Sequence, residues 1–270
     1  SSAGVLDVSS MAARRRTAWS VLLRTGKPAD GWVSRHCTRP LSRPVSFVLR
    51  WMGLTANHAS LLTLLVGFAT AALALTPGYL PLVGTGVLFQ LTSVLDGVDG
   101  EMARATLGES ESGALLDTIV DQLTYISCFV GVTIGWVREG AGLSGLLWTA
   151  AITLAMVLSL MRGWRFVTTH APNSSFVFID RSVRRAARDS GLAALKAAAA
   201  MFTLLRRDAF ATMFFFIALT GRRALIPAIC GLGVVLANVT LTRYRRELAA
   251  AAVALQRPAP SVGGSPPRQG

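Results

Sequence analysis

The sequence predicts an all-α integral membrane protein with six transmembrane helices, preceded by an amphipathic segment at the membrane surface. First, 52% of the 270 residues are hydrophobic and only 15% are charged, a balance typical of polytopic membrane proteins. Second, apolar runs of about 20 residues, the length that crosses a bilayer, recur along the chain. Third, Lys and Arg residues flank these runs, as they do at membrane surfaces.

Residues 1–55 are expected to form a cytoplasmic arm. No long apolar run follows the cluster Arg14–Arg16, so a cleaved signal peptide is not expected. The stretch Lys27–Arg50 mixes arginines with large apolar residues, which favours docking on an anionic membrane surface over the alternative of a solvated arm. Pro40 and Pro44 predict that this stretch is broken into short pieces.

Residues 56–242 are expected to form the membrane domain. The fifth predicted span is short, and an earlier start near Leu192 is the alternative. Residues 243–270 are expected to be a mostly disordered cytoplasmic tail, because the chain is rich in Pro, Gly and Ser from Gln256 onward. The six spans are placed at Ala59–Leu75, Leu80–Leu95, Ala114–Val137, Leu143–Leu160, Asp208–Thr220 and Ala224–Thr242.

The distribution of basic residues predicts the orientation in the membrane. All but three of the 27 Lys and Arg residues fall on the side that also holds both termini. The three exceptions are Arg138, Arg222 and Arg223. By the positive-inside rule, both termini are expected in the cytoplasm. The protein is expected to reside in the cell (inner) membrane. The stretch Asp96–Asp121 then lies at the cytoplasmic ends of the second and third spans.

Two other classes of function are disfavoured by composition. The net charge of +13 is not gathered beside aromatic residues that could stack on bases, so nucleic acid is not an expected partner, whereas membrane lipids are. Cys37, Cys128 and Cys230 are scattered and are expected to be free thiols, without a disulfide or zinc framework.

Four aspartates indicate a cation site. Asp96 and Asp99 are spaced i, i+3, and Asp117 and Asp121 are spaced i, i+4, so each pair shares one face if its segment is helical. A charged side chain within the membrane costs about 2.5–3.5 kcal/mol, and four neighbouring carboxylates also repel one another. Something cationic is therefore expected between them.

The cation is expected to be a hard metal ion. Ligands that offer only oxygen favour Mg²⁺, Mn²⁺ or Ca²⁺ over zinc. Two carboxylate pairs on facing helices suit two ions about 3.5–4 Å apart, as in phosphoryl displacement. Gly100 and Gly113 leave room for close approach of a phosphate or sugar, and Arg104 suits a diphosphate. A buried charge network or a cation transporter is the alternative.

These residues together resemble a known family. The pattern D-x2-D-G-x2-A-R-x8-G-x3-D-x3-D of the CDP-alcohol phosphotransferases is filled without a gap. The resemblance implies a six-helix membrane enzyme that is a homodimer and has its active site on the cytoplasmic side. The matching residues are Asp96, Asp99, Gly100, Ala103, Arg104, Gly113, Asp117 and Asp121.

The resemblance also implies a reaction and roles for residues. The hydroxyl of an acceptor attacks the β-phosphorus of a CDP-linked donor, CMP leaves, and Asp121 is the general base. Two Mg²⁺ (or Mn²⁺) ions are held by Asp96, Asp99, Asp117 and Asp121. Thr55–Ser60 partly matches the family's T-P-N-x-[VI]-T pattern, with Ala56 in place of Pro. The nucleotide side is expected to comprise Asp96, Gly100, Ala103, Arg104, Gly113 and Asn57.

The acceptor is expected to be a small polar molecule, with a phosphorylated polyol such as inositol phosphate favoured. The segment ahead of the membrane domain and the variant DGVDGEMAR resemble the di-inositol-phosphate phosphate synthases. The alternative is phosphatidyl transfer from CDP-diacylglycerol to glycerol phosphate, serine or inositol. The expected acceptor residues are Arg162, Arg165, Arg206 and Arg207, for which positive-inside anchoring is the competing interpretation.

Overall fold

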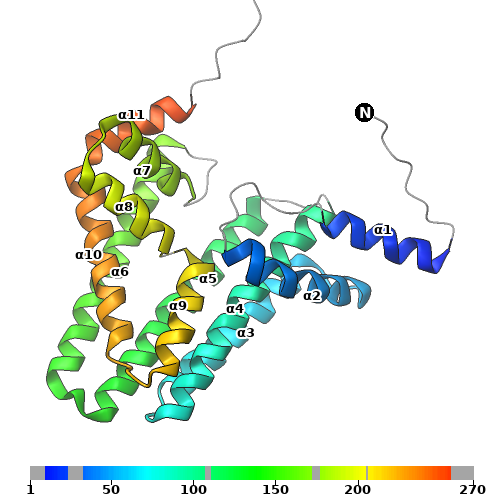
Figure 1. The fold of residues 1–270 in the computed structure, drawn as a ribbon, viewed down its shortest axis with the longest axis horizontal. Coiled ribbons are helices and arrows are strands. Elements are labelled where there is room, and N and C mark those ends of the chain that lie inside the picture. Colours follow the sequence, from blue (N-terminus) through cyan, green and yellow to red (C-terminus); the bar gives the residue numbers. More distant parts are fainter. Residues whose placement is uncertain (1–9, 24–32, 107–110, 172–176, 205, 257–270) are drawn as a thin grey trace, which may run out of the picture. The chain divides into compact units, whose positions relative to one another are not determined.

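The computed structural model describes residues 10–23, 33–106, 111–171, 177–204 and 206–256, and these ranges contain helices and no strand (Figure 1). They form two compact units, each described here by itself. The first comprises Ser1–Met156 and Thr203–Val234, and the second comprises Val157–Phe202 and Val235–Gly270. The predicted tail from 257 onward lies outside the described residues.

Most of the first unit is made of helices that run along the predicted spans. Its helices are α1 (Met11–Leu23), α2 (Arg39–Trp51, after a π-helical turn at Ser34–Thr38), α3 (Ala56–Ala74), α4 (Tyr79–Ala105), α5 (Glu111–Trp136) and α9 (Arg207–Leu219). The second unit holds α7 (Val177–Ser190), α8 (Ala193–Leu204) and α11 (Arg245–Gln256), while α6 (Gly142–His170) and α10 (Leu225–Arg243) contribute to both.

The candidate membrane spans agree with only part of the predicted set. Four helical stretches among the described residues are long and apolar enough to cross a membrane, namely Ala56–Ala74, Tyr79–Ala105, Leu115–His170 and Leu225–Arg243. The third stretch contains two predicted spans, separated where Gly140 adopts a non-helical φ of 109°. The fifth predicted span, α9, has 13 residues, so the count of six remains a prediction.

Three local features differ from the expectations. Pro44 lies inside a continuous α2, with Pro40 in its first turn, instead of breaking the segment. Both prolines are exposed, so the hydrogen bonds that their rings remove lie on the outer face of the helix. The segment near Leu192 leads into a separate helix, α8, and α11 occupies part of the predicted tail.

Aromatic side chains form the core of the first unit. The Phe89 ring of α4 lies 5.5 Å from Tyr125 of α5 and 5.1 Å from Phe214 of α9, measured between centroids. Glycine permits the closest helix contacts: a Cβ at Gly131 of α5 would lie 2.5 Å from the carbonyl oxygen of Ala71 of α3. The core therefore fixes α3, α4, α5 and α9 against one another.

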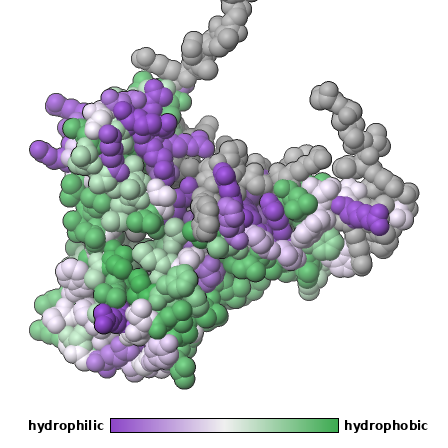
Figure 2. Space-filling model, viewed as in Figure 1, coloured by the Kyte–Doolittle hydropathy of each residue, from purple (hydrophilic) through white to green (hydrophobic). Residues whose placement is uncertain are grey.

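Apolar side chains also cover the outside of these helices. Figure 2 shows hydrophobic surface along α10, whose Leu232, Val235 and Val239 are exposed. Exposed apolar patches of this length are typical of surfaces that face lipid. Hydrophilic side chains gather instead over α7 and α11 (Figure 2), which carry the exposed Arg181 and Arg246. This pattern supports an integral membrane protein.

A buried arginine binds the backbone between α3 and α4 in the first unit. Arg223, in the loop between α9 and α10, donates hydrogen bonds to the carbonyls of Ala74 (2.6 Å) and Thr76 (2.8 Å). It also pairs with Glu139 at 3.1 Å. Burial lowers the pKa of Arg223, and the neighbouring carboxylate of Glu139 opposes that shift. Arg223 thus caps the C-terminus of α3.

Replacing Arg223 by Ala is expected to lower the melting temperature of the purified protein by several degrees. The change leaves the buried carbonyl of Ala74 without this donor, and an unsatisfied buried group costs about 1–3 kcal/mol. One kcal/mol corresponds to roughly 2–4 °C in a protein of this size. Arg222→Ala is the matched control, because Arg222 is its exposed neighbour, and should shift the transition by about 1–2 °C or less. Equal shifts in the two variants would contradict this role.

Candidate functional site

Three of the four predicted aspartates come together near the C-terminal end of α4. Asp96 and Asp99 lie on α4, and Asp117 lies near the start of α5. One carboxylate oxygen from each lies within 4.8 Å of the others. Asp99 is buried, whereas the other two are half-buried. The i, i+3 spacing therefore presents two carboxylates from α4 to a third on the neighbouring helix.

The fourth aspartate joins the cluster through Arg207. Arg207, the first residue of α9, donates from Nη1 to Oδ1 of Asp96 at 2.7 Å, and the same nitrogen forms an ion pair with Asp121. Its Nη2 donates to the carbonyl of Thr92 at 3.4 Å, and its guanidinium carbon lies 5.8 Å from the centre of the Tyr125 ring. Arg207 thus links α4, α5 and α9 at the aspartates.

The buried carboxylate of Asp99 is oriented by α3. Ser60 Oγ donates a hydrogen bond to Oδ2 of Asp99 at 2.7 Å, while the backbone N–H of Gly100 donates to Oδ1 at 2.5 Å. Ser60 is held in the first turns of α3, which begins with a capping box between Thr55 and His58. These two donors hold both oxygens of the Asp99 carboxylate in place within the cluster.

The residues expected on the nucleotide side lie on α4 and α5, which carry these carboxylates, and on α3. Ala103 and Arg104 follow Asp99 by one turn of α4, and both are half-buried, as are Gly100 and Gly113. A Cβ at Gly100 would lie 3.0 Å from Nη1 of Arg104, so the glycine gives the guanidinium its space. Asn57 is exposed in the first turn of α3, three residues before Ser60.

The four expected acceptor arginines fall into both units. Arg207 contacts Asp96 and Asp121 in the first unit, and Arg206 beside it lies 3.9 Å from Asp208. Arg162 donates to Asn238 within the second unit, where Arg165 is exposed. The role of Arg162 and Arg165 therefore stays a prediction.

Three residues at the site were not predicted. Tyr125 lies one turn beyond Asp121, and Thr92 lies one turn before Asp96, so their positions on the predicted helices could have pointed to them. Ser60 occupies the last position of the six-residue pattern Thr55–Ser60, where the family has a hydroxyl residue. The sequence pattern therefore carried a signal for Ser60, although not for its partner.

The chemistry of the donor set suits a divalent cation. Asp96, Asp99 and Asp117 offer oxygen atoms close to one another from two helices, and oxygen ligands favour hard ions such as Mg²⁺. Arg207 supplies one positive charge to this acidic cluster through Asp96 and Asp121. The remaining negative charge is in keeping with a site that takes up a cation.

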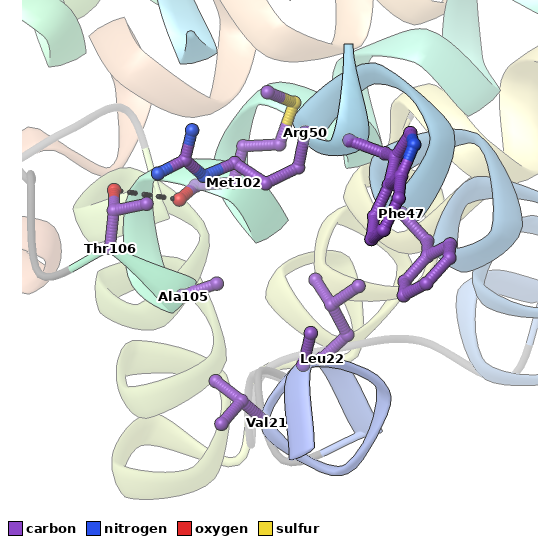
Figure 3. Close-up of a pocket in the computed structure, with 9 residues that line it drawn as sticks. Val21, Leu22, Phe47, Arg50, Met102, Ala105 and Thr106 are labelled. Atoms are coloured by element: carbon purple, nitrogen blue, oxygen red, sulfur yellow. Dashed lines mark hydrogen bonds between the residues drawn. The ribbon is translucent and has the colours of Figure 1, made fainter. Parts of the chain in front are cut away.

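A cavity of about 420 Å³ lies beyond the cluster, at the C-terminal end of α4 (Figure 3). Figure 3 shows Val21 and Leu22 of α1 on one side and Phe47 and Arg50 of α2 on another. Its described lining includes none of the predicted site residues. The cavity is mostly apolar, so it differs in character from the aspartate site.

Comparisons with known proteins find similar proteins that are named as transferases and synthases. A bifunctional IPC transferase and DIPP synthase from Thermococcus kodakarensis is 42% identical over 110 residues, which are 41% of this chain and 24% of that protein. The protein of the same name from Rubrobacter xylanophilus is 35% identical over 148 residues, 53% of this chain and 32% of that protein. An archaetidylinositol phosphate synthase from Pyrococcus horikoshii is 32% identical over 98 residues, 36% of this chain and 50% of that protein.

The matches to these relatives cover half of their length or less. The profile of the CDP-alcohol phosphatidyltransferase family matches residues 54–205. This range is more than half of the chain and contains the whole aspartate motif with its supporting Ser60. The chain is therefore a transferase and belongs to the CDP-alcohol phosphatidyltransferase family.

Proposed function

We propose that this protein transfers a substituted phosphate group from a CDP-linked donor to a hydroxyl of a phosphorylated polyol, inositol phosphate being the favoured acceptor. The acceptor oxygen forms a bond to the β-phosphorus of the donor, the bond from that phosphorus to the CMP oxygen breaks, and CMP leaves. The observation that carries the proposal is the cluster of Asp96, Asp99 and Asp117, linked through Arg207 to Asp121.

The reaction is proposed to depend on Mg²⁺ or Mn²⁺, with two ions at the site. Asp96, Asp99, Asp117 and Asp121 would hold them. When bound, the ions neutralise charge that develops on the diphosphate and on the leaving CMP. The chain itself contributes Ser60, which holds Asp99 by a 2.7 Å hydrogen bond, and Arg104, which is placed on the nucleotide side one turn beyond Gly100.

Asp121 is proposed to take the proton from the acceptor hydroxyl. A general base has to be ionised and close to the reacting group. Asp121 forms an ion pair with Arg207, and the guanidinium carbon of Arg207 lies 5.8 Å from the centre of the Tyr125 ring. These contacts support Asp121 as the base and Arg207 as its partner.

A phosphorylated acceptor fits the cationic side of the site. Arg207 lies at the aspartates and Arg206 is its neighbour. Arg162 and Arg165 of the second unit stay proposed acceptor residues on the strength of the sequence. Guanidinium groups bind phosphate through charge-assisted hydrogen bonds, whereas a neutral acceptor such as serine or inositol gives no reason to gather them. The names of the relatives support inositol phosphate chemistry.

A lipid donor is the second candidate. One relative is named for an archaetidyl product, and the two helices that carry the aspartates also expose apolar side chains, such as Leu91 of α4 and Leu123 of α5. Phosphatidyl transfer from CDP-diacylglycerol to glycerol phosphate, serine or inositol would use the same aspartates. A donor screen distinguishes the two candidates.

The setting in the cell is also part of the proposal. We infer residence in the cell membrane, with both termini and the aspartate cluster on the cytoplasmic side, from the positive-inside distribution. A homodimer is proposed from family membership. A cation transporter is less compatible with the structure, because Ser127 and Thr133, farther along α5, donate to carbonyls of their own helix.

The test is release of CMP by the purified protein from CDP-linked donors. Donors carrying inositol or diacylglycerol are combined with glycerol phosphate, serine, inositol or inositol phosphate, with and without excess chelator. We expect CMP release that requires Mg²⁺ or Mn²⁺ and is fastest with a phosphorylated acceptor. Full turnover in excess chelator would contradict the metal dependence. Ion flux into proteoliposomes without CMP release would favour the cation transporter.

A further inference from the structure

Glu101 is a buried acidic residue of α4 that the proposed reaction does not use. Its side chain is 0% exposed, although it follows Asp99 by only two residues. At about 100° per residue, Glu101 points about 140–160° away from Asp96 and Asp99 around the helix. It therefore lies on the back of the helix that carries the two aspartates.

Three side chains of α2 satisfy this carboxylate. Arg39 Nη1 and Ser42 Oγ each donate to Oε1 at 2.8 Å, and Ser46 Oγ donates to Oε2 at 2.7 Å. Arg39 is buried, and the two serines are fully buried. Arg39, Ser42 and Ser46 are spaced i, i+3, i+7, so they share one face of α2. We name these four residues the α2–α4 latch.

Around the latch, α2 touches the backbone of α4. Gly97 lies one turn before Glu101, and a Cβ there would meet Cβ and Oγ of Ser42 at 3.3 Å. Arg39 Nη1 also donates to the carbonyl of Gly97 at 3.4 Å. On the flank of this contact, Val98 and Met102 of α4 belong to an apolar cluster that includes side chains of α2 and α3. The latch is therefore a close and fully packed contact.

Stability alone does not explain such a latch. The free energy needed to remove two charges from water is about as large as the attraction that they gain by pairing. Well-packed apolar side chains in their place often stabilise a fold equally well. A buried charged network is instead directional, because its hydrogen bonds form at one register and one rotation. A rotation of α4 by about 20° would move a carboxylate near the helix surface by about 2 Å. Displacements of about 1 Å in a catalytic site can cost roughly 100-fold in rate.

We propose that the α2–α4 latch sets the rotation and axial position of α4, and that Glu101 and Arg39 are thus positioning residues for the aspartate site. In this way α2 affects the rate of phosphoryl transfer without contacting substrate, because it holds α4 from the face opposite the two aspartates. This inference rests on the proposed function for its kinetic readout. Binding of Mn²⁺ alone gives a second readout that does not need turnover.

The test exchanges the latch for apolar side chains of similar size. Arg39→Met, Ser42→Ala, Ser46→Ala and Glu101→Leu are combined in one variant, and Arg50→Met is the matched control on the exposed face of α2. We expect the combined variant to keep or raise the melting temperature without metal. We also expect its kcat to fall at least 30-fold and its half-saturating Mn²⁺, measured as a thermal shift, to rise at least threefold.

A single substitution covers the case in which the combined variant does not fold. Glu101→Gln keeps the shape of the side chain, and its amide can accept a hydrogen bond from Ser42 and donate one to Ser46. It removes the charge that holds Arg39. We expect its kcat to fall about fivefold or more, measured below the melting transition, with KM values for donor and acceptor close to those of the native protein. Arg39→Met removes the charge and should lower kcat. Arg39→Lys keeps the charge and should restore most of the rate that Arg39→Met loses.

The proposal is overturned if a folded variant without the latch keeps kcat and Mn²⁺ response within threefold of the native protein. It is also overturned if the loss of rate equals the loss of folded protein. Failure of the proposed function gives a different result: the native protein itself would release no CMP from any donor, while the Mn²⁺ titrations would still report on the latch.

Discussion

Asp121→Asn is expected to lower the turnover number by about 1,000-fold or more and to leave nucleotide binding largely intact. Asn has the shape of Asp and can still contact Arg207, but it cannot take a proton, and general-base catalysis contributes about 10²–10⁴-fold. Asp96, Asp99 and Asp117 keep their oxygens within 4.8 Å of one another. CMP release in a single turnover measures the rate, and a thermal shift with the CDP-linked donor measures binding.

The matched control for this variant is Asp189→Asn. Asp189 is an exposed aspartate of α7 that pairs with Arg185 at 2.7 Å, so its removal takes away the same charge at a distance in the sequence from the motif. It should leave turnover unchanged. Near-normal turnover in the Asp121 variant would reject the base assignment. Loss of donor binding in that variant would make metal or substrate binding the main role of Asp121.

The aspartate pairs were predictable because their spacing is local. Residues three or four apart on a helix share a face, and both segments form helices, α4 and α5. Placing Asp96, Asp99 and Asp117 together needed only the further expectation that these two helices lie side by side. The long apolar helices were predictable for a similar reason, since composition over about 20 residues sets them.

Sequence periodicity could not predict the contacts between distant segments, because it reports only on local structure. Arg207 lies 111 residues after Asp96, and Arg39 lies 62 residues before Glu101. Arginines near membrane spans are common because they set orientation. Their number concealed that Arg39 is a buried partner, and Arg207 a half-buried partner, of carboxylates. Glu101 looked like one more acidic residue in a charged stretch. Its burial against α2 depends on Gly97 and the serines of another helix.

Boundaries were also governed by tertiary structure. α4 extends to Ala105 because its last turns, with their charged residues, pack against α2 and α3. α11 forms in the predicted tail, where Leu248 and Ala251 are buried against Val183 of α7. Propensity alone does not foresee such a helix, because packing of an apolar face supplies most of the stability of a short helix.

Arg207→Ala is expected to raise the KM for the acceptor at least tenfold and to lower kcat as well. Each charge-assisted hydrogen bond to a phosphate contributes about 1.5–3 kcal/mol, and about 1.4 kcal/mol corresponds to a factor of ten. Arg207 also donates to Asp96 at 2.7 Å and forms an ion pair with Asp121. The Ala variant therefore removes the guanidinium that pairs with the proposed base, Asp121. Initial rates at varied acceptor and donor concentrations separate the two KM values.

Two variants show whether the guanidinium itself is required. Arg207→Lys keeps a positive charge but loses the fork that binds two partners at once, so it should recover part of kcat and little of the acceptor affinity. Arg184→Ala is the control, because Arg184 pairs with Asp180 on its own helix, α7, and should change neither KM. A donor KM that rises as much as the acceptor KM would place Arg207 on the nucleotide side. Faster turnover with serine, glycerol or free inositol than with the phosphorylated counterpart would refute a phosphate-binding role while leaving family membership intact.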